Sequence, residues 1–169
     1  MTLDQLANIV EILGILAILI AAIFGLAQFR QHRRDQRNLA ILEIARSFED
    51  REFTDAYLKL SSLEDNTTSE ALNALGDHYV SDALRVGMKY ETVGLLIYKG
   101  VVPMDALEDL VGDAALTLWR KLNVWVHQLR AERNHPRALE WFEWLAIQLE
   151  KRPASSRSVA AEAYPEYKH

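Results

Sequence analysis

One acidic side chain lies in an apolar helix face and is the residue best placed to do chemistry. Between residues 77 and 99 apolar residues recur at helical spacing, and Glu91 falls inside the apolar arc. A carboxylate in such a place must be hydrogen-bonded, ion-paired or protonated. The pattern predicts either a structural ion pair with Arg130 or Arg133, or a proton-relay or ligand site. No second carboxylate or histidine accompanies Glu91 at a useful spacing, which favours the structural pair.

The sequence lacks the common catalytic motifs. It contains no cysteine, which excludes disulfides, thiolate metal sites and a cysteine nucleophile. It has no HExxH zinc motif, no glycine-rich phosphate loop and no GxSxG nucleophile elbow, and its five histidines are scattered. The tryptophans and tyrosines follow helical spacing, which is typical of a core. We therefore expect no enzyme activity, no metal, no cofactor and no small-molecule substrate.

Two glycines in the same helix indicate close packing. Gly87 and Gly94 are seven residues apart on the apolar face. Because glycine costs about 1 kcal/mol relative to alanine inside a helix, its use here predicts close approach of a second helix.

Near the start of the chain lies an uncharged apolar stretch, residues 12–27. With its mildly interrupted flanks it extends from Leu6 to Phe29. A bilayer core about 30 Å thick needs about 20 helical residues, so the stretch predicts a transmembrane helix. Gly25-Leu26-Ala27 has the small-x-small pattern of a signal-peptide cleavage site, but a signal peptide carries its positive charge before the apolar core, and here the charge follows it.

One side of this helix carries small residues and predicts contact with another transmembrane helix. Ala21 and Gly25 form a small-xxx-small pair, which favours close backbone approach in lipid. Glu11 shares this side and is either solvated at the outer interface or, if deeper, paired with a partner. The predicted packing face consists of Glu11, Gly14, Ile18, Ala21 and Gly25.

Charge sets the expected orientation and partners. A basic cluster follows the apolar stretch, whereas no Lys or Arg precedes it, so the N-terminus is expected outside and the rest in the cytoplasm. Residues 38–169 carry 15 Lys or Arg against 21 Asp or Glu, a balance that disfavours nucleic-acid binding. The cluster can meet anionic lipid headgroups. Its arginines are Arg30, Arg33, Arg34 and Arg37.

The remaining chain reads as helices joined by short loops. The first helix is expected to end between Ser47 and Asp50, because no Gly or Pro occurs from residue 27 to 75. Thr67 and Glu70 have the spacing of a capping box. Gly112 is expected to separate a short helix, 104–111, from a longer one, 113–132, and the last helix is expected from Pro136 to Lys151.

In the last predicted helix two apolar residues lie opposite the apolar stripe. Trp144 and Ile147 fall beside Glu140 and Glu143. An outward tryptophan indicates a partner contact, a membrane-surface contact or packing against the tail; the partner contact is preferred. The tail, residues 152–169, has little apolar content and is expected to be exposed or disordered.

The run Tyr90-Glu91-Thr92-Val93-Gly94-Leu95-Leu96-Ile97-Tyr98-Lys99-Gly100-Val101-Val102 resembles the central block of an uncharacterised bacterial family. Trp119, Trp125 and the segment from Pro136 through Trp141-Phe142-Glu143-Trp144-Leu145 are similar too. Members have one N-terminal membrane helix and a cytoplasmic helical domain of unknown function. The resemblance implies that Glu91 belongs to the domain's framework, and it implies no catalytic residue.

The sequence thus predicts an all-α protein in three parts: a transmembrane anchor (1–29), a cytoplasmic bundle of about five helices (30–151) and a flexible tail (152–169). The expected location is the bacterial inner membrane. The expected function is a non-catalytic anchor or accessory subunit that binds another membrane protein through its span and a partner through its bundle. The alternatives are a membrane effector or sensor that acts by oligomerisation of the span, as in stress or phage defence, and an enzyme with an unrecognised site around Glu91.

Overall fold

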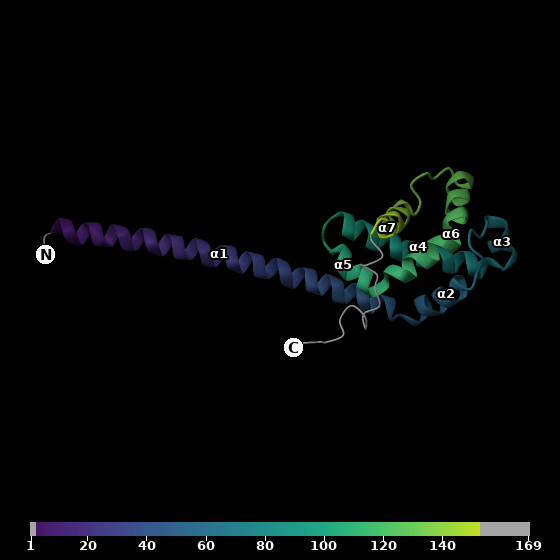
Figure 1. Ribbon diagram of the computed structural model, residues 1–169, viewed down its shortest axis with the longest axis horizontal. Helices are drawn as coiled ribbons and strands as arrows, with labels where there is room; N and C mark the ends of the chain where they lie inside the picture. Colours follow the sequence, from purple (N-terminus) through teal and green to yellow (C-terminus); the bar gives the residue numbers. More distant parts are fainter. Residues whose placement is uncertain (1–2, 153–169) are drawn as a thin grey trace. The chain divides into compact units, whose positions relative to one another are not determined.

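The structure is a computed structural model that describes residues 3–152 (Figure 1). Within the first helix, the side chains of residues 3–15, 17, 19, 33 and 34 lie outside the described part. The chain forms two compact units, one over residues 1–40 and one from residue 41 onward. All elements of the described residues are helices, as predicted. Apart from Arg152, the predicted tail lies outside the described residues.

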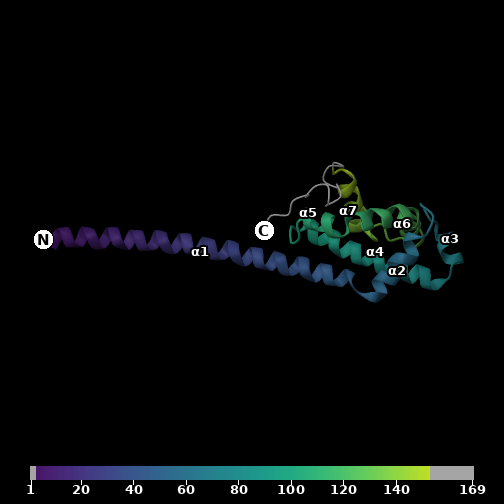
Figure 2. The ribbon, with the colours of Figure 1, turned by 60° about the horizontal axis from the view of Figure 1, so that its bottom comes forward.

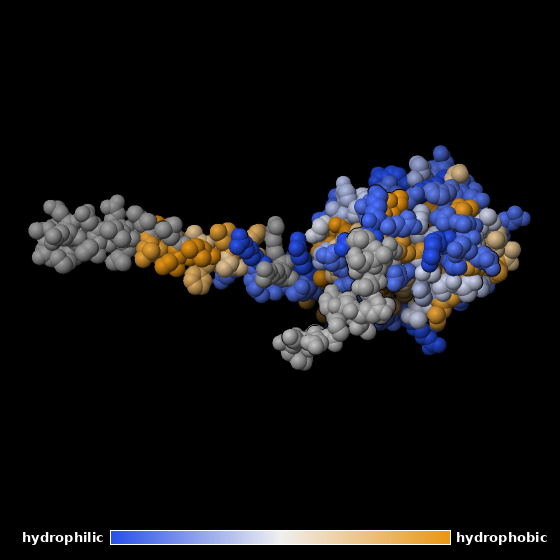
Figure 3. All heavy atoms as spheres, viewed as in Figure 1, coloured by the Kyte–Doolittle hydropathy of each residue, from blue (hydrophilic) through white to orange (hydrophobic). Residues whose placement is uncertain are grey.

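The first helix, α1, runs from Leu3 to Phe48. Its end agrees with the predicted one, and its last turns belong to the second unit. Most of its described side chains between residues 16 and 32 are exposed, and the apolar ones give way to hydrophilic ones along the helix (Figure 3).

No helix is long and apolar enough to span a membrane when only the described residues are considered. The predicted transmembrane helix is therefore not shown here. Part of the predicted stretch, residues 6–15, 17 and 19, has side chains outside the described part.

The second unit is a helical bundle in which α4 packs against α2 and α7, while α6 packs against α7, α2 and α3. Figures 1 and 2 both show α4 between α2 and α7. The helices after α1 are α2 (Arg51–Ser61), α3 (Ser69–Ala74), α4 (Asp77–Tyr98), α5 (Met104–Leu107), the π-helical turn η1 (Glu108–Gly112), α6 (Asp113–Glu132) and α7 (Glu140–Glu150).

The core of the bundle is centred on one aromatic residue of α4. Tyr90 is fully buried, and its ring lies 5.1 Å from that of Phe142, 5.5 Å from Phe48 and 6.2 Å from Phe53. These rings come from α1, α2, α4 and α7, so one residue joins four helices. Trp119 of α6 adds a fifth helix through its edge contact with Phe142 at 5.2 Å.

The predicted capping box at Thr67 is wrong by one residue. The cap of α3 is Thr68, whose hydroxyl accepts the Ala71 N–H at 3.2 Å. The Thr67 hydroxyl instead donates to the Glu64 carbonyl at 2.8 Å, and the Thr67 N–H donates to the Lys121 carbonyl of α6. This contact with α6 fixes the loop backbone, and it leaves the next threonine in the extended conformation that a cap requires.

Two helix boundaries also differ from the prediction. Gly112 does not separate two helices: it is buried with helical φ −58° and ψ −47°, and η1 carries the chain continuously from α5 into α6. The last helix begins at Glu140 instead of Pro136, because Leu139 takes a left-handed conformation, φ 55° and ψ 33°. Leu139 is itself buried, so packing of its side chain accompanies this unusual backbone.

Candidate functional site

Glu91 caps the N-terminus of α7. Its Oε2 accepts the backbone N–H of Trp141 at 2.7 Å and that of Phe142 at 2.9 Å. The residue in the cap position of α7 is Leu139, which has no side-chain acceptor. The first N–H groups of a helix have no partner within the helix and carry partial positive charge. A carboxylate from α4 therefore replaces the missing local cap.

The predicted ion pair of Glu91 with Arg130 or Arg133 is wrong. The guanidinium of Arg130 donates from Nη1 to Glu143 Oε2 at 2.6 Å and from Nε to the Ala138 carbonyl at 2.7 Å. Arg133 is exposed. Two backbone N–H groups at the start of α7 already satisfy the Glu91 carboxylate, so it needs no arginine.

The surroundings of Glu91 raise the pKa of its carboxyl group. Burial raises the pKa of Glu91, while the hydrogen bonds from Phe142 and Trp141 oppose that rise. Glu140 adds to the rise, and the positive charge of Arg130 opposes it. A half-buried carboxylate at a helix N-terminus is the arrangement of a structural cap.

Two glycines allow α7 to approach α4 closely enough for this cap. A Cβ on Gly94 would lie 2.2 Å from the Trp141 carbonyl oxygen, and one on Gly87 would lie 2.8 Å from Leu139 Cδ1. Both glycines are buried on the face that carries Glu91. The predicted close approach of a second helix at these glycines is confirmed.

The predicted packing face of α1 is described only in part. Ile18, Ala21 and Gly25 are exposed, and nothing in the described structure lies within 4 Å of a Cβ added to Gly25. The side chains of Glu11 and Gly14 lie outside the described part. In the basic cluster Arg30 and Arg37 are exposed, while the side chains of Arg33 and Arg34 are outside the described part.

Trp144 and Ile147 have different surroundings. Ile147 is 39% exposed, whereas Trp144 is half-buried against an aromatic neighbour on α4. The ring of Trp144 lies 5.8 Å from Tyr98 and 6.0 Å from Trp141. Tyr98 therefore covers part of the Trp144 ring, and the partner contact at Trp144 and Ile147 stays a prediction. Local residue spacing carries no signal for the contact between Trp144 and Tyr98, because the contact depends on where α4 ends beside α7.

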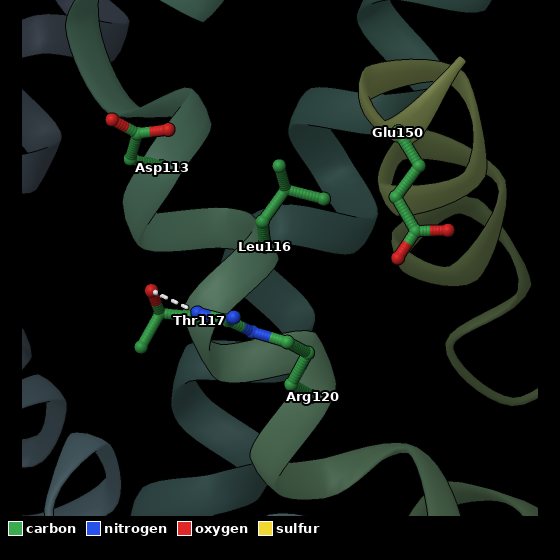
Figure 4. Close-up of a pocket in the computed structure, with 5 residues that line it drawn as sticks. All are labelled: Asp113, Leu116, Thr117, Arg120 and Glu150. Carbon is green, nitrogen blue, oxygen red and sulfur yellow. Dashed lines mark hydrogen bonds between the residues drawn. The ribbon is translucent and has the colours of Figure 1, made fainter. Parts of the chain in front are cut away.

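A pocket of about 460 Å³ lies between α6 and α7 (Figure 4). Asp113, Leu116, Thr117 and Arg120 come from α6 and Glu150 from α7, with Leu116 between the two carboxylates in this view. The one hydrogen bond drawn joins Arg120 to the Thr117 hydroxyl at 3.4 Å. Asp113, Arg120 and Glu150 are all exposed, so their charges are solvated and nothing activates a nucleophile here.

The described residues contain no group of three or more His, Asp or Glu side chains that could hold a metal ion. Glu132 and His135 are three residues apart, a spacing that helical metal sites use. Both are exposed where α6 ends, and His135 lies beyond the helix.

The fold and the Glu91 site define an all-α domain in which a carboxylate of one helix caps the N-terminus of another. A comparison with protein families matches residues 12–149 to the domain of unknown function DUF4760, and the chain belongs to this family. The match includes both the apolar part of α1 and the bundle. Comparisons with curated proteins and with solved structures give no match.

Proposed function

We propose that the protein is a non-catalytic, single-pass membrane anchor or accessory subunit. The apolar part of α1 would lie in the bacterial inner membrane with the N-terminus outside. There it would bind another transmembrane helix, and the bundle would bind a cytoplasmic partner. The basic cluster that follows the apolar part supports this orientation, since basic residues stay on the cytoplasmic side.

One observation carries the proposal: large apolar side chains of α1 are exposed on every side of the helix. Leu16, Ile18 and Ile20 are 48–70% exposed. A soluble monomer rarely exposes so much contiguous apolar surface, which marks contact with lipid or with a partner. The same holds further along for Ile23, Phe24, Leu26 and Phe29, which are 57–67% exposed.

The non-catalytic part of the proposal is supported by the role of Glu91. Its carboxylate accepts two backbone N–H groups, so it is engaged in holding α7. The pocket of Figure 4 is lined by exposed, solvated charges. Neither place has the nucleophile-and-base arrangement that covalent catalysis needs.

Membrane fractionation of the full chain tests the anchor. We expect the protein in the membrane fraction after an alkaline carbonate wash. Ile20→Asp combined with Ile23→Asp should release it, because each charge costs about 3 kcal/mol inside the bilayer. The matched control, Leu58→Asp with Met88→Asp, changes residues of the bundle that are similarly exposed, and it should stay bound. Wild-type protein in the soluble fraction would refute the anchor.

Orientation can be read with single cysteines, since the chain has none. A membrane-impermeant maleimide should label Thr2→Cys in intact cells, but Ala131→Cys only after lysis. Ala131 is an exposed position of α6. The reverse pattern would refute the proposed orientation.

The helix partner is tested by co-purification in mild detergent. Gly25→Leu should dissociate a bound membrane protein, because close approach over small residues is lost. Ile23→Leu, on another side of the helix, should not. A wild-type chain that runs alone as a monomer would contradict this part of the proposal.

A further inference from the structure

Three aromatic side chains form one exposed edge of the bundle, here called the aromatic edge: Tyr98 of α4 with Trp141 and Trp144 of α7. The Tyr98 ring lies 4.6 Å from Trp141 and 5.8 Å from Trp144. Tyr98 is 56% exposed, and both tryptophans are half-buried. The edge therefore presents large apolar rings that carry polar O–H and N–H groups.

A shallow hollow adjoins the aromatic edge. It has a volume of about 500 Å³, and Trp144 forms part of its wall together with Ile97 and Met104. Gln148, Lys151 and Arg152 complete the lining, so the hollow combines apolar side chains with an amide and two cationic groups.

Two lysines lie beside the aromatic edge, although the bundle as a whole is acidic. Lys99 Nζ lies 5.8 Å from the centre of the Tyr98 ring, and Lys151 is exposed at the hollow. Neither lysine forms an ion pair within the described part of the chain. The acidic neighbours Asp105 and Glu108 are both paired with Arg152 at 2.5 Å.

We propose that the aromatic edge lies on the headgroup region of an anionic membrane. This inference rests on the proposed function, in which α1 anchors the protein in that membrane. Tyrosine and tryptophan concentrate at membrane–water interfaces, and each lysine near an anionic surface adds about 1 kcal/mol of attraction. The chain between Phe29 and Ile41 reaches at most about 40 Å even when fully extended, so the bundle stays near the membrane.

The composition of the edge favours lipid over a protein partner. Protein interfaces are enriched in arginine and depleted in lysine. At this edge the lysines are the unpaired cations, while Arg137 is paired with Glu140 at 2.5 Å and Arg152 with its acidic neighbours. Flexible ammonium groups beside half-buried rings match the headgroup layer, where long side chains extend towards phosphate.

The test uses the full chain reconstituted in vesicles of phosphatidylglycerol and phosphatidylcholine, the latter brominated near the headgroup to quench tryptophan. Two of the four tryptophans lie at the aromatic edge. Trp144→Phe should therefore lower, about twofold, the part of the tryptophan fluorescence that the brominated lipid quenches, because interfacial rings lie within reach of the bromines. Trp125→Phe is the matched control, since Trp125 is only 2% exposed, and it should leave the quenched emission unchanged.

A second pair of variants tests the charges. Lys99→Gln with Lys151→Gln should reduce quenching in anionic vesicles. Lys59→Gln with Lys121→Gln removes the same charge elsewhere, where both lysines are paired with aspartates, and should not. If the chain floats with vesicles but Trp144→Phe leaves quenching unchanged, the edge does not touch lipid and the inference fails while the anchor stands. If the chain does not float, both fail.

Discussion

Glu91 closes the start of a helix that begins 49 residues later in the chain. Its hydrogen bonds to Trp141 and Phe142 supply acceptors where Leu139 offers none. A helix N-terminus favours negative charge, so a carboxylate there stabilises both the α7 backbone and its contact with α4. At the scale of the residue, this cap is the main polar link between the two helices.

Removing the cap should destabilise the bundle. We expect Glu91→Leu to lower the free energy of unfolding by about 2 kcal/mol, since two buried N–H groups lose their acceptor. Glu91→Gln keeps a carbonyl acceptor and should cost about 1 kcal/mol or less. Urea unfolding at pH 7 measures both, with Glu132→Gln, an exposed carboxylate at the end of α6, as control. Equal losses for Leu and Gln would contradict the cap.

The pKa of Glu91 gives a further prediction. Because burial raises this pKa, the folded chain holds the proton more tightly than the unfolded chain. The part of the Glu91 contribution that comes from binding this proton is therefore fully present below the unfolded pKa and is lost as pH rises through the folded pKa, whereas the hydrogen bonds from Trp141 and Phe142 remain at pH 7. The wild type should thus gain stability relative to Glu91→Gln between pH 7 and pH 4. A difference that grows towards pH 7 would contradict the sign.

Tyr90 carries a buried hydroxyl that has no hydrogen-bond partner in the described structure. Burial also raises the pKa of this hydroxyl, so it stays protonated. Tyr90→Phe removes an unsatisfied polar atom and keeps the ring contacts, and it should raise the free energy of unfolding by about 1 kcal/mol. Chemical unfolding checks this; a loss of stability would show that the hydroxyl has a partner.

At the scale of the element, the α4–α7 contact depends on the missing side chain of Gly94. The Trp141 carbonyl occupies the space that a Cβ would take, and that carbonyl belongs to a helix backbone that cannot move alone. The contact at Gly87 is less rigid, because Leu139 Cδ1 is the end of a side chain.

Alanine substitutions distinguish Gly87 and Gly94, where a Cβ would be too close to its neighbours, from Gly112, where a Cβ fits. Gly94→Ala should lower the free energy of unfolding by about 3 kcal/mol through overpacking, and Gly87→Ala should cost less. Gly112→Ala is the control: its Cβ would make ordinary contacts at 3.5 Å with Glu108 and Leu149, and the backbone is already helical. It should be neutral or stabilising by up to about 1 kcal/mol. Thermal melts of the three variants give the order; equal effects would contradict this account.

At the scale of the whole molecule, the chain divides inside a continuous helix. Residues 1–40 and the residues from Ile41 onward form two units, because most contacts lie within each unit. The helix α1 nevertheless runs through the boundary. The aromatic core that joins α1, α2, α4, α6 and α7 lies entirely in the second unit. The bundle therefore has its own core.

A chain that begins at residue 38 should fold by itself. It retains Ile44, which is 8% exposed, and Phe48, which contacts Phe53 at 4.9 Å. We expect a single cooperative urea transition with a midpoint close to that of the full chain in detergent, because stability follows the buried core. A chain that begins at residue 51 lacks these contacts and should unfold at lower urea. Equal midpoints for the two chains would contradict a core that includes the end of α1.

The sequence by itself determined the helical class, the end of the first helix and the close approach at Gly87 and Gly94. These features follow from local spacing and from the cost of glycine, which act within a few turns of chain. The proposed membrane anchor likewise rests on the sequence, namely on the apolar stretch and on the basic cluster that follows it.

Only the tertiary structure decided which groups satisfy one another. The sequence showed that Glu91 needed a partner but not that the partner was the backbone of α7, because that depends on the left-handed turn at Leu139. The cap likewise lies at Thr68 instead of Thr67, because the Thr67 backbone is bonded to α6. Gly112 is buried and has a helical conformation instead of ending a helix. In each case the hydrogen-bond partner or the packing lies far away in sequence. Its identity is fixed by how the helices dock, which no local pattern encodes.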